Sequence, residues 1–241
     1  MKLVADLHTH TIASGHAYST FEEMVDAARE KGLQMIAITD HGSQMPGAPD
    51  LDYFWNTLIW PREVNGVQVL RGVEANIIDT KGRLDIPDEI LESLDIVLAG
   101  FHYGTGYQGS TVEENTQAMV NALQNPLVHI IVHPGNPKFP IDYERVVHVA
   151  RENGKALEIN NSTFMGIRPQ SYQPCLRIAK LAEQNGVLLA VNSDAHICYQ
   201  VGDCSLAMDV VQKAGIEESN ILNTSVELIQ EFLSRHGKHI L

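Results

Sequence analysis

Seven short segments rich in Val, Ile and Leu alternate with amphipathic segments along the sequence. The apolar segments are residues 3–8, 34–41, 68–78, 95–102, 128–133, 155–161 and 187–196. Strands that are apolar on both faces are typical of a parallel sheet that helices cover and right-handed crossovers connect. This alternation predicts an α/β fold, which an open sheet and a closed barrel satisfy equally well.

Helices are predicted between and after these strands. The helical segments are residues 21–32, 112–125, 142–154, 171–186, 204–215 and 225–237. Ser19 and Glu22 have the spacing of a capping box that begins the first helix, and Gly32 ends it. No linker or low-complexity tract interrupts the pattern, so we expect a single domain over residues 1–241.

Residue types that bind metals stand where the predicted strands end. They are His8 and His10, His41, Glu74, His102, His133, and Asp194 with His196, while the sixth strand offers Asn160 and Asn161. Side chains at positions i and i+2 of a strand share a face, which predicts that His8 points with His10 and Asp194 with His196. An open sheet spreads strand ends along a line, whereas a barrel gathers them at one mouth. We therefore predict a barrel with a metal site there, which His16 reaches from the first loop.

Composition narrows the class of protein. A net charge of -13 disfavours a nucleic-acid surface, which needs basic patches. No apolar run approaches the length of a membrane helix and no signal-peptide pattern is present, so we expect a cytoplasmic protein without a membrane partner. Three cysteines without C-x-x-C spacing predict neither a disulfide framework nor a thiolate zinc site. A closed ring of a few copies, a homo-oligomer, is compatible with this size.

The remaining histidines are expected to have other roles. His148, His236 and His239 lie in helical or terminal segments, where a solvated or capping role is usual. His129 shares the strand parity of His133 but stands near the opposite end of the strand. We expect it to be structural, with a polar partner inside the barrel.

Several motifs resemble those of the PHP family, named for polymerase and histidinol phosphatase, and in particular its small stand-alone phosphatases of the YcdX type. They are "DLHTHTIASGHAYST", "ITDHG", "LRGVEAN", "LAGFH", "IIVHPGNPK", "LEINNS" and "NSDAH", which together span nearly the whole chain. The resemblance implies a distorted (β/α)7 barrel, similar to a TIM barrel, with three divalent metals at its C-terminal mouth.

The resemblance also implies how the ligands are shared among the metals. His8, His10, Glu74 and Asp194 are implied for the first metal, Glu74, His102 and His133 for the second, and His16, His41 and His196 for the third. A carboxylate has two oxygens and can bridge two cations, which suits Glu74. Imidazole and carboxylate ligands favour Zn²⁺, with Mn²⁺ or Fe²⁺ as alternatives.

Such a centre suits a metal-dependent phosphatase, and we hypothesise hydrolysis of small phosphate monoesters. A hydroxide held between the first two metals, whose pKa the metals lower toward neutrality, would attack phosphorus. Lys138 and Arg168 follow strands on the mouth side and are candidates to bind the phosphate of a small substrate. Asp40 is expected to orient a ligand through a hydrogen bond or to cap a helix. Arg71, whose parity is opposite to that of Glu74, is left out of the site.

Two other classes of function stay open. An amidohydrolase-type C–N hydrolase also begins with H-x-H on a barrel strand, but it normally has a bridging lysine at a strand end, and no predicted strand here ends in lysine. A non-catalytic metal-binding PHP module is the other alternative. Because the set of metal ligands is complete, a catalytic function is favoured over a non-catalytic module.

Overall fold

The protein is built around one parallel sheet, seen here in a computed structural model that describes residues 1–109 and 111–240. The strands are β1 (Ala5–Thr9), β2 (Met35–Ile38), β3 (Glu63–Val64), β4 (Val67–Asn76), β5 (Ile96–Gly100), β6 (Ile130–Ile131), β7 (Ala156–Asn160) and β8 (Leu189–Asn192). Seven of them pair in parallel in the order β1-β2-β4-β5-β6-β7-β8. The short β3, which was not predicted, pairs antiparallel with β4.

The first and last strands of the sheet meet and nearly close it. Thr9 forms a parallel bridge with Ala195, and the N–H of His10 donates to the carbonyl of Ala195 at 2.9 Å. Next to this bridge, the N–H of Leu7 donates to the side-chain carbonyl of Asn192 at 3.0 Å. The prediction of a seven-stranded, TIM-barrel-like α/β fold is confirmed.

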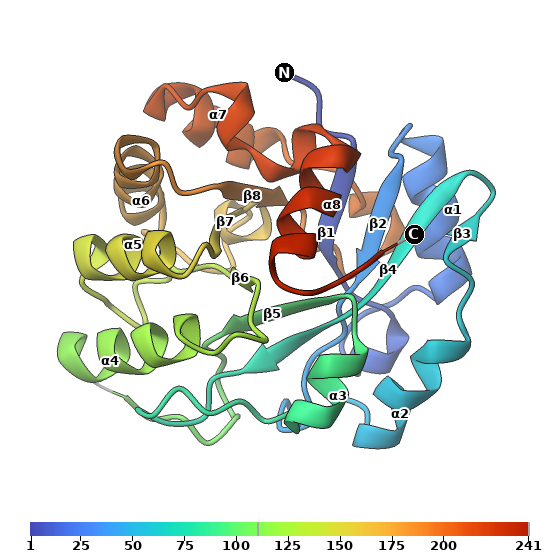
Figure 1. Ribbon diagram of the computed structural model, residues 1–241, viewed down its shortest axis with the longest axis horizontal. Coiled ribbons are helices and arrows are strands. Elements are labelled where there is room, and N and C mark those ends of the chain that lie inside the picture. Colours follow the sequence, from blue (N-terminus) through green and yellow to red (C-terminus); the bar gives the residue numbers. More distant parts are fainter. Residues whose placement is uncertain (110, 241) are drawn as a thin grey trace.

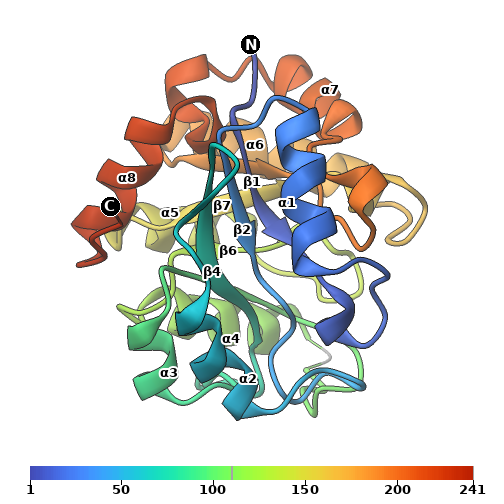
Figure 2. The same ribbon diagram turned by 90° about the vertical axis from the view of Figure 1, so that its right-hand side faces the viewer.

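Helices surround the strands (Figures 1 and 2). They are α1 (Phe21–Glu30), α2 (Leu51–Asn56), α3 (Asp88–Ser93), α4 (Val112–Leu123), α5 (Tyr143–Glu152), α6 (Tyr172–Asn185), α7 (Ser205–Ala214) and α8 (Val226–Arg235). The short helices α2 and α3 lie in segments for which no helix was predicted. No helix within the described residues is long and apolar enough to cross a membrane.

The barrel interior is filled by alternate residues of the strands and is completed by α8. Ala5, Leu7, Ala37 and Leu98 belong to this interior cluster. Side chains of α8 join the same cluster: Val226, Ile229, Phe232 and Leu233. Figure 1 shows α8 in front of the strands, across the barrel. Because α8 packs against the interior residues on one side, the open mouth lies at the other end, where the strands end.

The start of α1 differs from the prediction by one residue. Thr20, not Ser19, is the N-cap, and Thr20 and Glu23 exchange the two hydrogen bonds of a capping box. The Ser19 hydroxyl instead accepts the N–H of Cys198 at 3.0 Å, so it ties the loop after β1 to the loop after β8. The predicted Ser19 and Glu22 box is therefore wrong, because a tertiary contact uses the serine.

Candidate metal centre

The structure brings all nine predicted ligands together at the C-terminal ends of the strands. His8 stands on β1 and Glu74 on β4, and the other seven lie in the segments that follow the strands. Eight of the nine residues range from buried to about three-quarters buried, and His16 is the most accessible. The chain therefore gathers imidazoles and carboxylates from six of its strands into one cluster.

Glu74 is the centre of this cluster. Its Oε1 lies 2.9 Å from Nε2 of His133 and 3.0 Å from Nε2 of His102. Its Oε2 lies 3.3 Å from Nε2 of His8 and 3.4 Å from Nε2 of His10. Oε2 also lies 2.8 Å from Nδ1 of His41. The two carboxylate oxygens thus face different sets of histidines, which is the arrangement of a carboxylate that bridges two cations.

Three pairs of histidines turn their Nε2 atoms toward each other. The distances are 3.0 Å between His8 and His10, 3.1 Å between His102 and His133, and 3.2 Å between His16 and His41. Nitrogen ligands of one tetrahedral zinc ion, about 2.0–2.1 Å from the metal, lie roughly 3.3 Å apart. The observed separations are close to this value.

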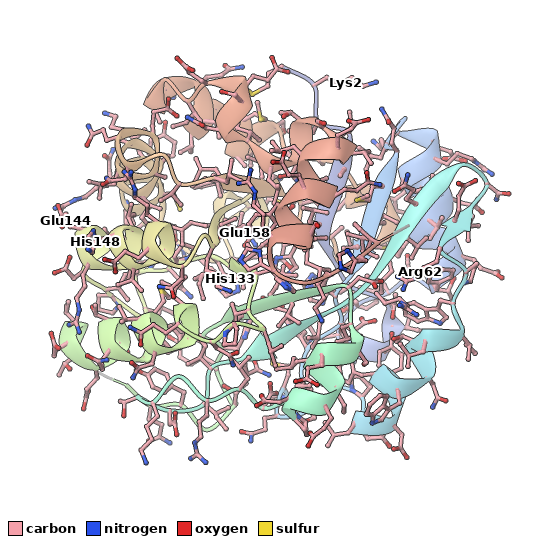
Figure 3. The ribbon with its side chains drawn as sticks, in the orientation of Figure 1. Lys2, Arg62, His133, Glu144, His148 and Glu158 are labelled. Carbon is pink, nitrogen blue, oxygen red and sulfur yellow. The ribbon has the colours of Figure 1, made fainter. Side chains whose placement is uncertain are left out.

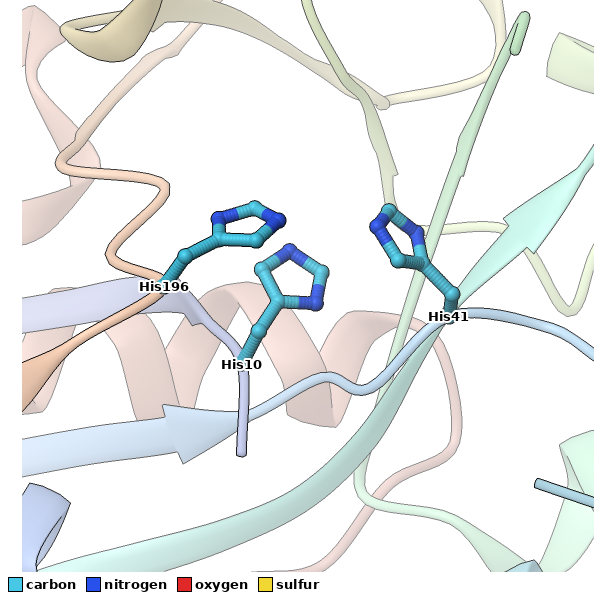
Figure 4. Close-up of side chains that lie close together, drawn as sticks. All are labelled: His10, His41 and His196. Carbon is cyan, nitrogen blue, oxygen red and sulfur yellow. The ribbon is translucent and has the colours of Figure 1, made fainter. Parts of the chain in front are cut away.

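Asp194 lies beside the His8 and His10 pair, and His196 lies beside the His16 and His41 pair. Oδ1 of Asp194 lies 3.2 Å from Nε2 of His10 and 3.6 Å from Nε2 of His8. The ring of His196 lies 5.0 Å from that of His16, centroid to centroid, and 4.4 Å from that of His10. Figure 4 shows His10 between His41 and His196. His10 therefore lies where the group of His8, His10 and Asp194 meets the group of His16, His41 and His196.

Irregular backbone, and not strand alternation, aims several of these side chains. The pairing of β1 with β2 shifts register between Asp6 and Thr9, as a β-bulge does, so Leu7 packs in the interior while its neighbour His8 also reaches the site. His133 and Asp194 have φ values of 35° and 56°, in the left-handed region that costs energy for residues other than glycine. His8 lies with His10 and Asp194 with His196, as predicted, but His10, Asp194 and His196 lie beyond the ends of the strands, so regular strand alternation does not by itself position them.

Acceptors behind the rings fix the tautomers of four histidines. Nδ1 of His8 lies 2.7 Å from Oε1 of Glu158, and Nδ1 of His102 lies 2.7 Å from the side-chain oxygen of Asn76. Nδ1 of His196 lies 3.0 Å from the carbonyl of Asp194. Because these oxygens only accept, each Nδ1 carries the hydrogen. In the neutral ring, the lone pair of Nε2 then faces the cluster.

The fourth ring, His10, is oriented through two residues. The hydroxyl of Ser14 donates to Asp40 at 2.6 Å, so it accepts the hydrogen of Nδ1 of His10, which lies 3.1 Å away. Asp40 also accepts from the N–H and hydroxyl of Thr11. Asp40 therefore orients the ring of His10 through Ser14, in line with the role predicted for it.

Glu158 is a residue that the sequence reasoning missed. Its Oε1 faces His8, and its Oε2 accepts the backbone N–H of His133 at 2.8 Å. The side chains of Asn160 and Asn192 donate to the same carboxylate. Figure 3 shows Glu158 and His133 in the middle of the molecule. The signal was a single acidic residue inside an apolar strand, two positions before Asn160.

A buried carboxylate that stays ionised and buried imidazoles that stay neutral make the cluster suitable for binding cations. Burial raises the pKa of Glu74, but His102, His8 and His41 outweigh this and hold it well below its usual value. Burial lowers the pKa of His41 to about 4. Burial, followed by the charge of Arg168, lowers the pKa of His133 to about 4. His41 and His133 are therefore neutral at pH 7 and have lone pairs available.

His8 behaves in the opposite way. Burial lowers its pKa, but Glu74, Glu158 and Asp194 together raise it well above the usual 6.5. Three buried carboxylates thus attract positive charge to this position. Of the described lysines and arginines, Arg168 alone comes within 4 Å of one of them, at 3.5 Å from Asp194.

Two buried atoms of the cluster lack hydrogen-bond partners. Oε2 of Glu74 and Nδ1 of His41 lie 2.8 Å apart, yet neither makes a hydrogen bond. Buried polar atoms without hydrogen-bond partners are rare in native proteins, and they often belong to a site that binds an ion. The residues present therefore fit divalent metals.

A cavity of about 560 Å³ opens beside the cluster. His16, His41, His102, Asp194 and His196 form part of its lining. Arg168 also lines it and lies 3.4 and 3.3 Å from the hydroxyls of Ser162 and Thr163. Lys138 is exposed and lies with its ammonium 4.5 Å from the centre of the Tyr103 ring; it is not part of the lining.

Four residues that the sequence analysis placed outside the metal site do lie outside it. Arg71 forms a buried ion pair with Asp95, with Nε 3.0 Å from the carboxylate. His148 is exposed on α5, and His236 caps the end of α8 with Nδ1 2.9 Å from the carbonyl of Phe232. Nδ1 of His129 accepts the N–H of Val97 at 2.9 Å, as expected of a structural residue, but its Nε2 is without a partner.

Known sequences resemble this chain along its whole length. The family model described as "PHP domain" matches residues 6–162. A probable phosphatase of Thermoanaerobacter sp. (strain X514) is 50% identical over 240 residues, covering 100% of this chain and 98% of the relative. A probable phosphatase of Acetivibrio thermocellus is 46% identical and covers 100% of this chain and 99% of its own.

A solved structure shows the same fold at low identity. It is a histidinol phosphate phosphatase from Lactococcus lactis, complexed with zinc, L-histidinol and phosphate. The two chains superpose with a TM-score of 0.66 and 18% identity, covering 90% of this chain and 95% of the other.

Proposed function

The chain belongs to the PHP domain family, and we propose that this metal-dependent phosphatase hydrolyses small phosphate monoesters at a centre of three divalent ions. The first ion would be held by His8, His10, Glu74 and Asp194, the second by Glu74, His102 and His133, and the third by His16, His41 and His196. The observation that carries the proposal is Glu74, whose two oxygens face separate sets of histidines.

Zinc is the proposed metal, with manganese or iron as the alternatives. The ligands are imidazoles and carboxylates without thiolates, a set that zinc accepts readily. When bound, the ions supply a water of lowered pKa and neutralise charge that develops on the phosphoryl oxygens.

The side chains of the protein have distinct tasks in this proposal. Arg168 lines the cavity close to Asp194 and is placed to donate two hydrogen bonds to non-bridging phosphate oxygens. Glu158 and the Ser14 and Asp40 pair hold the rings of His8 and His10 in one orientation. Preorganised donors and fixed ligands need little rearrangement during the reaction, which is how an enzyme stabilises a transition state.

Metal counting and phosphate release test the proposal together. We expect close to three metal ions per chain and release of phosphate from p-nitrophenyl phosphate, with both reduced in Glu74→Gln. Full metal occupancy without phosphate release from a diverse panel of monoesters would favour the non-catalytic module. Hydrolysis of amides in place of phosphoesters would favour the amidohydrolase alternative.

A further inference from the structure

The cavity beside the metal centre has two chemically different parts. One part is the imidazole and carboxylate cluster with Arg168. The other part is apolar and comes from the loops that follow β1, β2, β7 and β8. Its members are Tyr18, Met45, Met165, Ile167 and Ile197. A phosphate bound at the first part would leave its ester group against the second.

Three of these apolar side chains are strongly exposed. The exposed fractions are 74% for Tyr18, 47% for Met165 and 62% for Ile167. A single exposed apolar residue is ordinary, but several around one opening are typical of a surface that covers a ligand. Their exposure costs free energy, which a bound apolar group would recover.

A glycine lies between two of these apolar residues. Gly166, between Met165 and Ile167, has φ +91°, and nothing lies within 4 Å of the position where a Cβ would be. This left-handed turn is open to glycine and strained for other residues. Met165 and Ile167, two positions apart, both line the cavity, and Arg168, the residue after Ile167, lines it as well.

Charge is confined to the metal side of the cavity. Among the described residues that line it, apart from the histidines, the charged ones are Arg168 and Asp194, which lie 3.5 Å from each other. Gln200 and Ser162 add uncharged polar groups. An ammonium, carboxylate or second phosphate on the ester group would lose water without gaining a partner of opposite charge.

We propose that the preferred substrates are monoesters of apolar, uncharged alcohols, whose hydrocarbon part packs on Tyr18, Met165 and Ile167. The proposal rests on the proposed function, because the phosphate must lie at the metal centre for the ester group to reach this wall. It goes further by naming the chemistry of the alcohol.

A series of n-alkyl phosphates tests this proposal. Ethyl, butyl and hexyl phosphate have leaving groups of similar basicity, so a change in kcat/KM along the series reports binding of the chain and not its chemistry. Burial of one methylene group changes a binding constant by about fourfold at most. We therefore expect kcat/KM to rise roughly two- to fourfold for each added methylene. We expect 6-aminohexyl phosphate to fall well below hexyl phosphate.

Binding of the matching alkylphosphonates to the zinc-loaded protein gives a readout without turnover. We expect Kd, measured by calorimetry, to decrease with chain length. The double variant Met165→Ser and Ile167→Ser should flatten both series, whereas Ile59→Ser, which alters an isoleucine 83% exposed outside the cavity, should not.

The outcomes separate the two proposals. A flat dependence on chain length in an enzyme that hydrolyses ethyl phosphate overturns the apolar preference and leaves the phosphatase function intact. Chain-length-dependent binding of phosphonates without hydrolysis of any ester supports the apolar wall and overturns the proposed function.

Discussion

Oε1 of Glu158, on β7, lies 2.7 Å from Nδ1 of His8, on β1. The other oxygen of the same carboxylate accepts the backbone N–H of His133, a residue held at φ 35°. One buried side chain therefore orients proposed ligands of two different ions.

Glu158→Gln should weaken metal binding without unfolding the protein. Loss of a hydrogen-bonded partner behind a metal ligand typically costs roughly 10- to 100-fold in metal affinity or activity. We expect a loss of this size in zinc affinity, measured by competition with a chelator. Glu152→Gln, an exposed change on α5, is the control and should bind zinc as the wild type does. Equal affinities in both variants would contradict the role given to Glu158.

Glu74→Gln and His41→Ala should lose different numbers of ions. Glutamine has one neutral oxygen and cannot bridge two cations, so Glu74→Gln should retain about one ion of three, by the reasoning that a bridge needs both oxygens. His41→Ala removes a proposed ligand of the third ion, and about two ions should remain by the same reasoning. Elemental analysis of dialysed protein gives the counts. The same count in both variants would argue against a bridging Glu74.

Arg168→Met should impair the reaction more than Lys138→Met. Hydrogen bonds to charged groups contribute about 1.5–3 kcal/mol, which corresponds to a loss of roughly 10- to 150-fold in kcat/KM for Arg168→Met. Lys138 is exposed and outside the cavity lining, so its loss should change kcat/KM less than about threefold, as for a screened surface charge. The reverse order would assign the phosphate contact to Lys138.

Stabilisation by zinc should increase with pH above 6.5. The pKa of His8 is raised above 6.5 in the metal-free fold, so its protonated form stabilises that fold at low pH, and this contribution is lost as pH rises through the raised pKa. Metal binding requires the neutral ring and releases the proton. The difference in Tm between zinc-loaded and chelator-treated protein should therefore grow with pH until the pH passes the raised pKa of His8, and then level off. In Glu158→Gln, where one of the carboxylates that raise this pKa is gone, the growth should level off at lower pH.

Arg71→Met should destabilise the fold and leave the metals in place. It would leave Asp95 buried without its main partner, and breaking a buried pair costs about 3–5 kcal/mol. Arg62 contacts the same carboxylate from a position 41% exposed, so Arg62→Met should cost no more than about 1 kcal/mol. Urea denaturation measures both, and loss of zinc from folded Arg71→Met would contradict the assignment of Arg71 to the outside of the site.

The sequence predicted the strands and the ligand types because both are local patterns. Apolar runs ended by His, Asp or Glu mark where strands leave the core. Glu74 and His41 could therefore be predicted as candidate ligands from the local sequence alone. Long periodic segments such as that of α6 were equally clear. The helices α2 and α3 have six residues each, too few for a periodic signal.

What the sequence did not predict depends on tertiary contacts. The orienting roles of Glu158 and Asn76 follow from which ring each meets across the barrel, at separations of 150 and 26 positions. The left-handed backbone of His133 and Asp194 has no sequence signal, because histidine and aspartate do not require it. The N-cap of α1 moved by one residue because a distant loop uses Ser19.

Closure of the barrel between Thr9 and Ala195 joins residues that are far apart in the chain. His8 and His10 leave the ribosome well before Asp194 and His196, which face the same place. In a growing chain, the other proposed ligands of the first and third ions are therefore made before Asp194 and His196, which complete them. We therefore expect the proposed first and third ion sites to be completed only after β8 has docked beside β1.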